Sequence, residues 1–132
     1  MSQGESATPL GKVRGLGSSH QGGHHWLEER FTSIVLLLLS LWLVFSLLML
    51  PVLDRAALTE WLGSAWGAIP MALLIVTAFR HGLDGLKVAV DDYVQDEGTR
   101  IGIHFALTMA AVAGGAISLF ALAKIAFGAP PA

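Results

Sequence analysis

The sequence predicts an all-α membrane protein with three transmembrane helices. Of its 132 residues, 54% are hydrophobic and only 14% are charged, whereas soluble domains carry about a quarter charged residues. The apolar residues also fall into three uncharged blocks, at 31–53, 61–79 and 101–123. As an α-helix, each block reaches roughly 28 to 35 Å, which matches the hydrocarbon core of a bilayer.

The first transmembrane helix is expected over about 26–53. Its apolar side chains surround the whole helix, which a soluble bundle with polar outer faces would not allow. Pro51 predicts a kink or a stop near its outer end. Residues 1–25 are rich in Gly, Ser and His and predict a flexible cytoplasmic segment. This segment contains no apolar run typical of a cleaved signal, so we expect the first helix to be retained.

The second helix is expected over about 60–94, with Thr59 as its N-cap and Pro70 as a possible bend. Its uncharged part ends at Phe79, but no proline or turn cluster follows before Gly98. The helix therefore continues beyond its apolar block.

The third helix is expected over about 100–126, which completes a three-helix domain at 26–127 and leaves a C-terminal tail at 128–132. Small side chains on this helix favour close packing against other helices. They are Ala106, Ala110, Ala113, Gly114, Gly115 and Ala121.

The basic residues predict the orientation in the membrane. The first loop and the end of the third helix should lie on the same side of the membrane. Of the eight lysines and arginines, only Arg55 and Lys124 lie on that side, and the other six lie on the side of the N-terminus. Cytoplasmic segments carry an excess of basic residues. We therefore expect a cytoplasmic N-terminus and a C-terminus on the outer, periplasmic side.

Several function classes are excluded or unsupported. The chain has no cysteine, which excludes disulfides and iron–sulfur clusters held by this chain alone. It contains no phosphate-binding loop, activated nucleophile or metalloprotease helix, so independent catalysis is not expected. A basic patch suited to nucleic acid is also absent from the sequence.

The extended second helix presents two polar faces. His81, Gly85, Val88 and Asp92 fall within about 60° of one another on a helical projection. An adjacent stripe carries charges of alternating sign, so that Arg80 can pair with Asp84, and Lys87 with Asp84 or Asp91. Such a stripe is typical either of a solvated helix end or of a contact with a partner protein. The stripe consists of Arg80, Asp84, Lys87 and Asp91.

His81 and the Asp92–Tyr93 pair carry the chemistry on this helix. A neutral imidazole beside a glycine suits an axial heme ligand with room for the porphyrin, although a structurally paired histidine is the alternative. Tyr93 lies roughly 18 Å further along the axis. Its hydroxyl can donate a hydrogen bond to a quinone carbonyl while Asp92 orients it or relays protons.

The pattern H-x3-G-x6-D-Y at 81–93 resembles the second helix of the smaller hydrophobic membrane anchor of succinate dehydrogenase, respiratory complex II. The glycine-rich N-terminal segment, followed by Arg30 and Thr32 in RFTSI, is similar to bacterial anchor subunits. The three-helix architecture also fits, so that the resemblance spans nearly the whole chain.

The resemblance implies a non-catalytic subunit of an enzyme complex in the bacterial inner membrane. His81 would be an axial ligand of heme b, with Gly85 packing beside the heme and Arg30 near its propionates and the quinone. Tyr93 would bind ubiquinone, with Asp92 beside it. The implied partners are a flavoprotein, an iron–sulfur subunit and a larger cytochrome b556 anchor that supplies the other heme ligand.

The sequence also departs from this pattern. Asp91 adds a second acid before the tyrosine, and Gln95 and Asp96 stand where a histidine is expected, which leaves the charge environment of a quinone site open. Arg80 places a cation directly before His81. A fumarate reductase anchor, or a homo-oligomeric transporter or pore with Arg80, Asp84 and Lys87 along an aqueous path, are the alternative functions.

The remaining histidines are not expected to share a heme with His81. His104 lies one turn into the third helix and differs from His81 in depth by roughly 15 Å, so one iron cannot bind both. His20, His24 and His25 could bind a metal, but exposed histidines in a flexible tail are the simpler interpretation.

Overall fold

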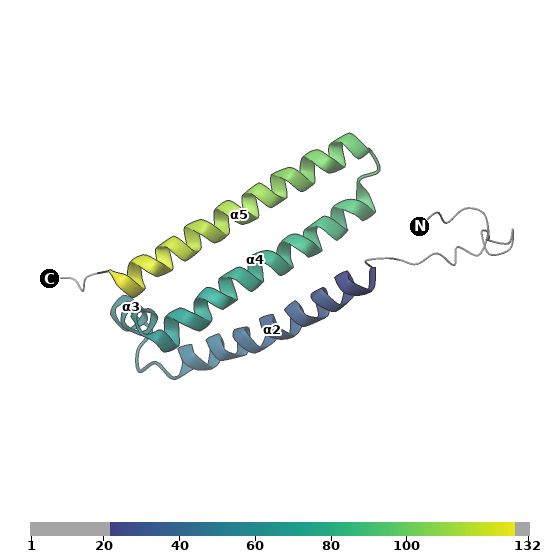
Figure 1. The fold of residues 1–132 in the computed structure, drawn as a ribbon. Coiled ribbons are helices and arrows are strands. Elements are labelled where there is room, and N and C mark those ends of the chain that lie inside the picture. Colours follow the sequence, from purple (N-terminus) through teal and green to yellow (C-terminus); the bar gives the residue numbers. More distant parts are fainter. Residues whose placement is uncertain (1–21, 129–132) are drawn as a thin grey trace, which may run out of the picture.

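A computed structural model describes residues 22–128, and within them the chain forms four helices and no strand (Figure 1). The prediction of an all-α protein is confirmed. Three of the helices are long and apolar enough to cross a membrane. The elements are α2 (Gly22–Leu48), α3 (Arg55–Gly63), α4 (Ala65–Tyr93) and α5 (Glu97–Phe127).

The three long helices lie in one layer with α4 in the middle (Figure 1). Among the described helices, α4 contacts both α2 and α5, whereas α2 and α5 do not contact each other. The short α3 lies at the end of the layer where α2 ends, and it packs against α4 and α5. The residues at the opposite end, where α4 passes into α5, are those that the sequence assigns to the cytoplasmic side.

This layer has almost no interior. Among residues 26–128, Leu122 and Gly67 are the only buried residues. Large apolar side chains such as Phe31, Leu38 and Phe45 on α2 are more than half exposed. A chain that exposes apolar side chains around whole helices must cover them with lipid or with other helices.

The first spanning helix differs from its expected bounds at both ends. It ends at Leu48 rather than near residue 53, because Pro51 cannot donate the next helical hydrogen bond and its ring disfavours helix in the residues just before it. It begins at Gly22, so that 22–25 are helical rather than flexible. The rest of the expected flexible segment, 1–21, lies outside the described residues, as does the tail after Gly128.

The expectation that one helix begins near Thr59 is wrong. Thr59 lies inside α3, where its hydroxyl donates to the carbonyl of Arg55 at 2.7 Å. The N-cap of α3 is Asp54, whose carboxylate accepts a hydrogen bond from the Ala57 amide at 2.8 Å. The chain then breaks at Ser64, which is both the C-cap of α3 and the N-cap of α4. The second span therefore begins at residue 65 rather than 60.

Gly67 makes the tight corner between α3 and α4 possible. Its amide donates to the Ser64 hydroxyl at 3.1 Å, and a Cβ added at this position would collide with the backbone carbonyl of Trp61. Because backbone cannot move aside cheaply, we expect Gly67→Ala to destabilise the folded chain by about 1–3 kcal/mol or more. The measurement is thermal loss of helical circular dichroism in detergent.

Gly102→Ala is the matched control for that substitution. A Cβ at Gly102 meets nothing within 4 Å, and alanine favours a helix over glycine by about 0.5–1 kcal/mol. Gly102→Ala should therefore unfold at the same temperature as the natural chain or higher. Equal thermal unfolding midpoints for Gly67→Ala and Gly102→Ala would contradict the role assigned to Gly67.

The glycine pair on α5 is a packing surface, as the sequence indicates. The ring of Phe79 on α4 lies against Gly114 and Gly115. A Cβ at Gly114 would approach a ring carbon of Phe79 to 2.7 Å, whereas one at Gly115 would make an ordinary contact at 3.7 Å. Gly114 therefore sets how closely α4 and α5 approach.

Asp96 caps α5, which begins at Glu97 rather than near residue 100. Its carboxylate accepts a hydrogen bond from the Thr99 amide at 2.7 Å. Hydrogen bonds from Thr99, first from its side chain and then from its backbone, lower the pKa of Asp96 below 3.8. The ionised carboxylate is thus the form that stabilises this helix end.

This lowered pKa gives an expected pH dependence. A group whose pKa is lower in the folded state stabilises the fold fully above its unfolded pKa, and this contribution is lost as the pH falls through the folded value. The contribution of Asp96 should therefore be lost progressively as the pH falls from the ordinary range of an aspartate through its lower pKa in the folded chain. Asp96→Asn retains a capping oxygen but does not titrate, so its helicity should change less over this interval. Identical acid titrations of helical circular dichroism for both chains would contradict this.

Candidate functional site

A groove between α2 and α4 gathers several of the residues that the sequence singles out. It has a volume of about 290 Å³, which is just below the range of roughly 300–1,000 Å³ for complete small-molecule sites. A groove of this size, open on one side of a single layer of helices, is suited to be part of a site that another chain completes. Its lining residues are Trp26, Glu29, Arg30, Ser33, His81, Asp84 and Gly85.

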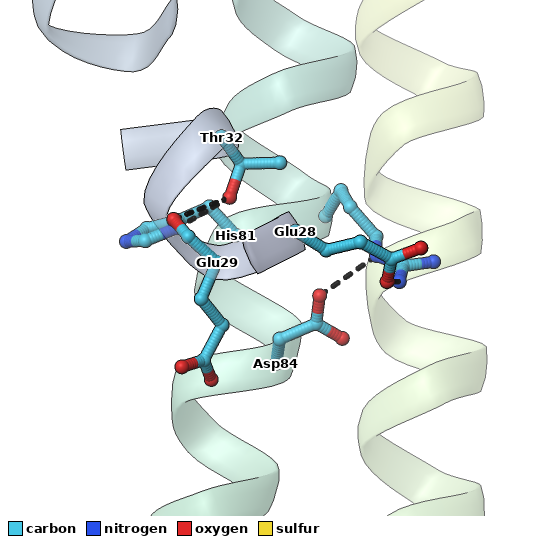
Figure 2. A network of polar contacts seen from close by, with 6 residues as sticks. Glu28, Glu29, Thr32, His81 and Asp84 are labelled. Atoms are coloured by element: carbon cyan, nitrogen blue, oxygen red, sulfur yellow. Dashed lines mark hydrogen bonds and ion pairs between the residues drawn. The ribbon is translucent and has the colours of Figure 1, made fainter. Parts of the chain in front are cut away.

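His81 is held from α2. Its ring nitrogen Nδ1 lies 3.1 Å from the hydroxyl oxygen of Thr32 (Figure 2). That hydroxyl also donates to the carbonyl of Glu29 at 3.1 Å. The imidazole is half-buried and lines the groove. The imidazole of His81, a polar group in a largely apolar layer, thus has a protein partner at Nδ1.

Gly85, one turn after His81, leaves the wall of the groove open. A Cβ added to Gly85 would meet nothing within 4 Å. The space beside the imidazole is therefore not filled by another side chain of the described chain. A flat, wide group bound to His81 could approach the backbone here, so these residues fit a heme.

Arg30 lies on the α2 side of the same groove. Its guanidinium lies 5.3 Å from the centre of the Trp26 ring, which is within range of a cation–π interaction. Arg30 is exposed, and it lines the groove together with His81. A permanent cation that lines the same groove as the imidazole suits a ligand that carries carboxylates.

The charged stripe on α4 is partly paired as predicted. The Arg80 guanidinium is 2.7 Å from the Asp84 carboxylate, which confirms that pair, and 3.5 Å from the carboxylate of Glu28 on α2 (Figure 2). Within the described residues, Lys87 forms no ion pair. The acids on both sides of Arg80 neutralise it and connect α2 to α4.

Asp91, at the other end of the stripe, pairs with α5 instead of Lys87. Its carboxylate lies 3.7 Å from Arg100 Nε and 3.2 Å from His104 Nε2. His104 therefore interacts at the α4–α5 contact, whereas His81 interacts with α2. The two imidazoles therefore contact different neighbouring helices of the layer.

The structure does not bring Asp92 and Tyr93 into the groove with His81. Both are exposed at the last turn of α4, and 87% of Tyr93 is accessible. The rise along an α-helix places Tyr93 about 18 Å from His81. The candidate site therefore has two separate parts on one helix, and the second is a tyrosine and an acid that face away from the chain.

Among the described side chains of residues 26–128, no three metal-ligating groups lie close enough together to hold a metal ion. The cluster of His20, His24 and His25 that the sequence offers for a metal cannot be tested, because His20 and the side chains of the other two lie outside the described part of the chain.

Two contacts at the site were not predicted from the sequence. One is the hydrogen bond between Thr32 and His81, and the other is the ion pair between Glu28 and Arg80. The signal available was a polar stretch, E-E-R-F-T-S, at the start of an otherwise apolar helix. Polar groups in a spanning helix usually face protein rather than lipid, but this does not identify their partners.

Comparison with known proteins identifies the family. Residues 5–117 match the family described as succinate dehydrogenase/fumarate reductase transmembrane subunit. The chain belongs to this family. The resemblance inferred from residues 81–93 is therefore confirmed, and the three candidate spans make this family member a multi-pass membrane protein.

Similar proteins are named succinate dehydrogenase hydrophobic membrane anchor subunits. That of Rickettsia bellii is 34% identical over 63% of this chain and 66% of its own length, and that of Rickettsia conorii is 31% identical over 63% and 67%. The chain thus spans about two thirds of the length of these relatives. The Paracoccus denitrificans subunit is 27% identical over 92% of this chain and 94% of its own length. No solved structure matches this chain significantly.

Proposed function

We propose that this chain is the small membrane anchor of a succinate dehydrogenase, in which it supplies one axial ligand of heme b and part of a ubiquinone site. The observation that carries the proposal is the single groove lined by His81, Gly85 and Arg30. The names of the similar proteins support succinate as the electron donor of the complex. The reverse direction, fumarate reduction, would use the same anchor.

His81 would hold the heme iron through its second ring nitrogen, Nε2. The open wall at Gly85 would accept the edge of the porphyrin, and the Arg30 guanidinium would balance the charge of the propionates. When bound, heme b supplies a one-electron redox centre within the membrane. The groove belongs to one face of an open layer, so a further ligand would come from a larger cytochrome b anchor.

Tyr93 and Asp92 would bind the ubiquinone head group at the membrane surface. The phenol would donate a hydrogen bond to a quinone carbonyl, and the carboxylate would orient the phenol or relay a proton. Tyr93 is exposed in this chain, so other walls of the site would come from the neighbouring anchor and the iron–sulfur subunit. Electrons would reach the site through a flavoprotein and that iron–sulfur subunit.

The charge distribution supports a cytoplasmic position for this end of the molecule. Arg30 lies in the first half of α2, Arg80 and Lys87 in the second half of α4, and Arg100 near the start of α5, whereas Arg55 begins α3 and Lys124 lies near the end of α5. By the positive-inside rule, the N-terminus would be cytoplasmic and the C-terminus periplasmic in the bacterial inner membrane.

Purification of the tagged chain from mild detergent tests the proposal. We expect it to elute with a flavoprotein, an iron–sulfur protein and a second anchor, and to show a b-type absorption band after reduction with succinate. A colourless homo-oligomer would overturn the proposal and favour a transporter or pore.

A further inference from the structure

The hydroxyl of Thr32 contacts two groups, and it has a single proton to donate. It donates its single proton to the carbonyl of Glu29 at 3.1 Å. In the 3.1 Å contact with Nδ1 of His81, the same oxygen is then able to accept a hydrogen bond from Nδ1–H. This arrangement suits the tautomer that carries its proton on Nδ1 and leaves the lone pair of Nε2 free.

We propose that Thr32 is a positioning residue that keeps His81 in the tautomer and orientation able to bind heme iron through Nε2. This rests on the proposed role of His81 as an axial ligand. Metal-bound histidines commonly donate their other N–H to an oxygen, which fixes the ring and raises the basicity of the ligand nitrogen.

The position of Thr32 suits this role. It lies on α2, while His81 lies on α4, so the bond fixes the imidazole relative to both walls of the groove. Both residues are half-buried, which limits competition from water. The Glu29 carbonyl also accepts from the Ser33 hydroxyl at 2.8 Å. Removing the Thr32 hydroxyl therefore leaves that carbonyl with a partner, and the imidazole Nδ1 is the group that loses one.

The test uses Thr32→Val in the complete, purified complex. Valine has nearly the shape of threonine but no hydroxyl. A hydrogen bond donated by the ligand imidazole makes it more electron-rich and favours ferric over ferrous heme, so its loss should favour the ferrous form. At a fixed ambient potential, we expect the ferrous-to-ferric ratio to rise at least about threefold, a shift of the heme midpoint of about 30 mV. The ferric heme should also show altered electron paramagnetic resonance g values.

Two substitutions serve as controls. Thr32→Ser retains the hydroxyl and should keep the midpoint and g values of the natural complex. Thr108→Val removes a threonine hydroxyl from α5 that donates only to the carbonyl of His104, at 2.7 Å, and it too should leave both unchanged. An unaltered midpoint and spectrum in Thr32→Val, or an equal shift in Thr108→Val, would overturn the proposal.

A further pair covers the case in which valine impairs assembly. Thr32→Ser and Thr32→Ala both lack the γ-methyl group and differ only in the hydroxyl. A midpoint that differs between them supports the role of Thr32, and a shared midpoint overturns it. His81→Ala separates this result from the proposed function. If His81→Ala loses heme but the Thr32 variants have no effect, the ligand role of His81 stands and only the positioning role of Thr32 is rejected. Full heme in His81→Ala rejects both.

Discussion

Replacing His81 with alanine should remove heme b from the complex while the three helices remain inserted. If His81 holds the heme iron as proposed, its removal would leave only ligands from the partner chain, and even the loss of an outer contact to a metal ligand weakens binding by about 10- to 100-fold. We therefore expect heme per flavin to fall at least about tenfold. The measurement is a pyridine hemochrome assay on purified complex.

Insertion itself should not suffer from this substitution. Alanine is less costly in hydrocarbon than a polar imidazole. The contacts of α4 with α5 include the Phe79 ring against Gly114, whereas His81 contacts Thr32 on α2. The amount of chain in the membrane should therefore match that of the natural protein. Loss of heme together with loss of the chain would indicate failed assembly and would not count in favour of a ligand role.

His104→Ala is the matched control. His104 is the other histidine that lies within a spanning helix and has contacts that the structure describes. His104 lies 3.2 Å from Asp91 at the α4–α5 contact and does not line the groove. Heme content should be unchanged in this variant. A heme deficit in His104→Ala equal to that in His81→Ala, or full heme in both, would contradict the assignment of His81.

The hydropathy of the sequence was sufficient to predict the long helices, because an uncharged stretch that spans a bilayer has few other stable forms. The short α3 was missed for a local reason. Asp54, Thr59 and Ser64 are all good N-cap residues, and the sequence does not show which of them the chain uses. The choice depends on the corner at Gly67, where α3 packs back against α4.

The candidate site could be predicted only in part. Gly85 and His81 were placed on one face because they lie one turn apart on the same helix, and local periodicity is enough for that. Thr32 and His81 are separated by 49 residues, so their contact depends on how α2 and α4 are rotated and shifted against each other. The same holds for Asp91, which pairs with α5 rather than with Lys87 on its own helix.

Tyr93→Phe should lower the rate of electron transfer to ubiquinone by about tenfold. A change of this size is expected when a lost hydrogen bond leaves a buried quinone oxygen unsatisfied. The substitution removes one oxygen atom and retains the ring. Because 87% of Tyr93 is exposed in this chain, the loss of its hydroxyl should disturb nothing within the chain. Any defect would therefore report a contact with quinone or with another subunit.

Two assays on the same preparation separate these possibilities. Succinate oxidation with a soluble artificial acceptor does not require the quinone site and should remain at the level of the natural complex, whereas ubiquinone reduction should fall. Trp66→Phe, which changes an exposed aromatic residue at the opposite end of α4, should leave both rates unchanged. If Tyr93→Phe lowered both rates equally, its hydroxyl would act in assembly with the catalytic subunits. If it lowered neither, the quinone would bind without Tyr93.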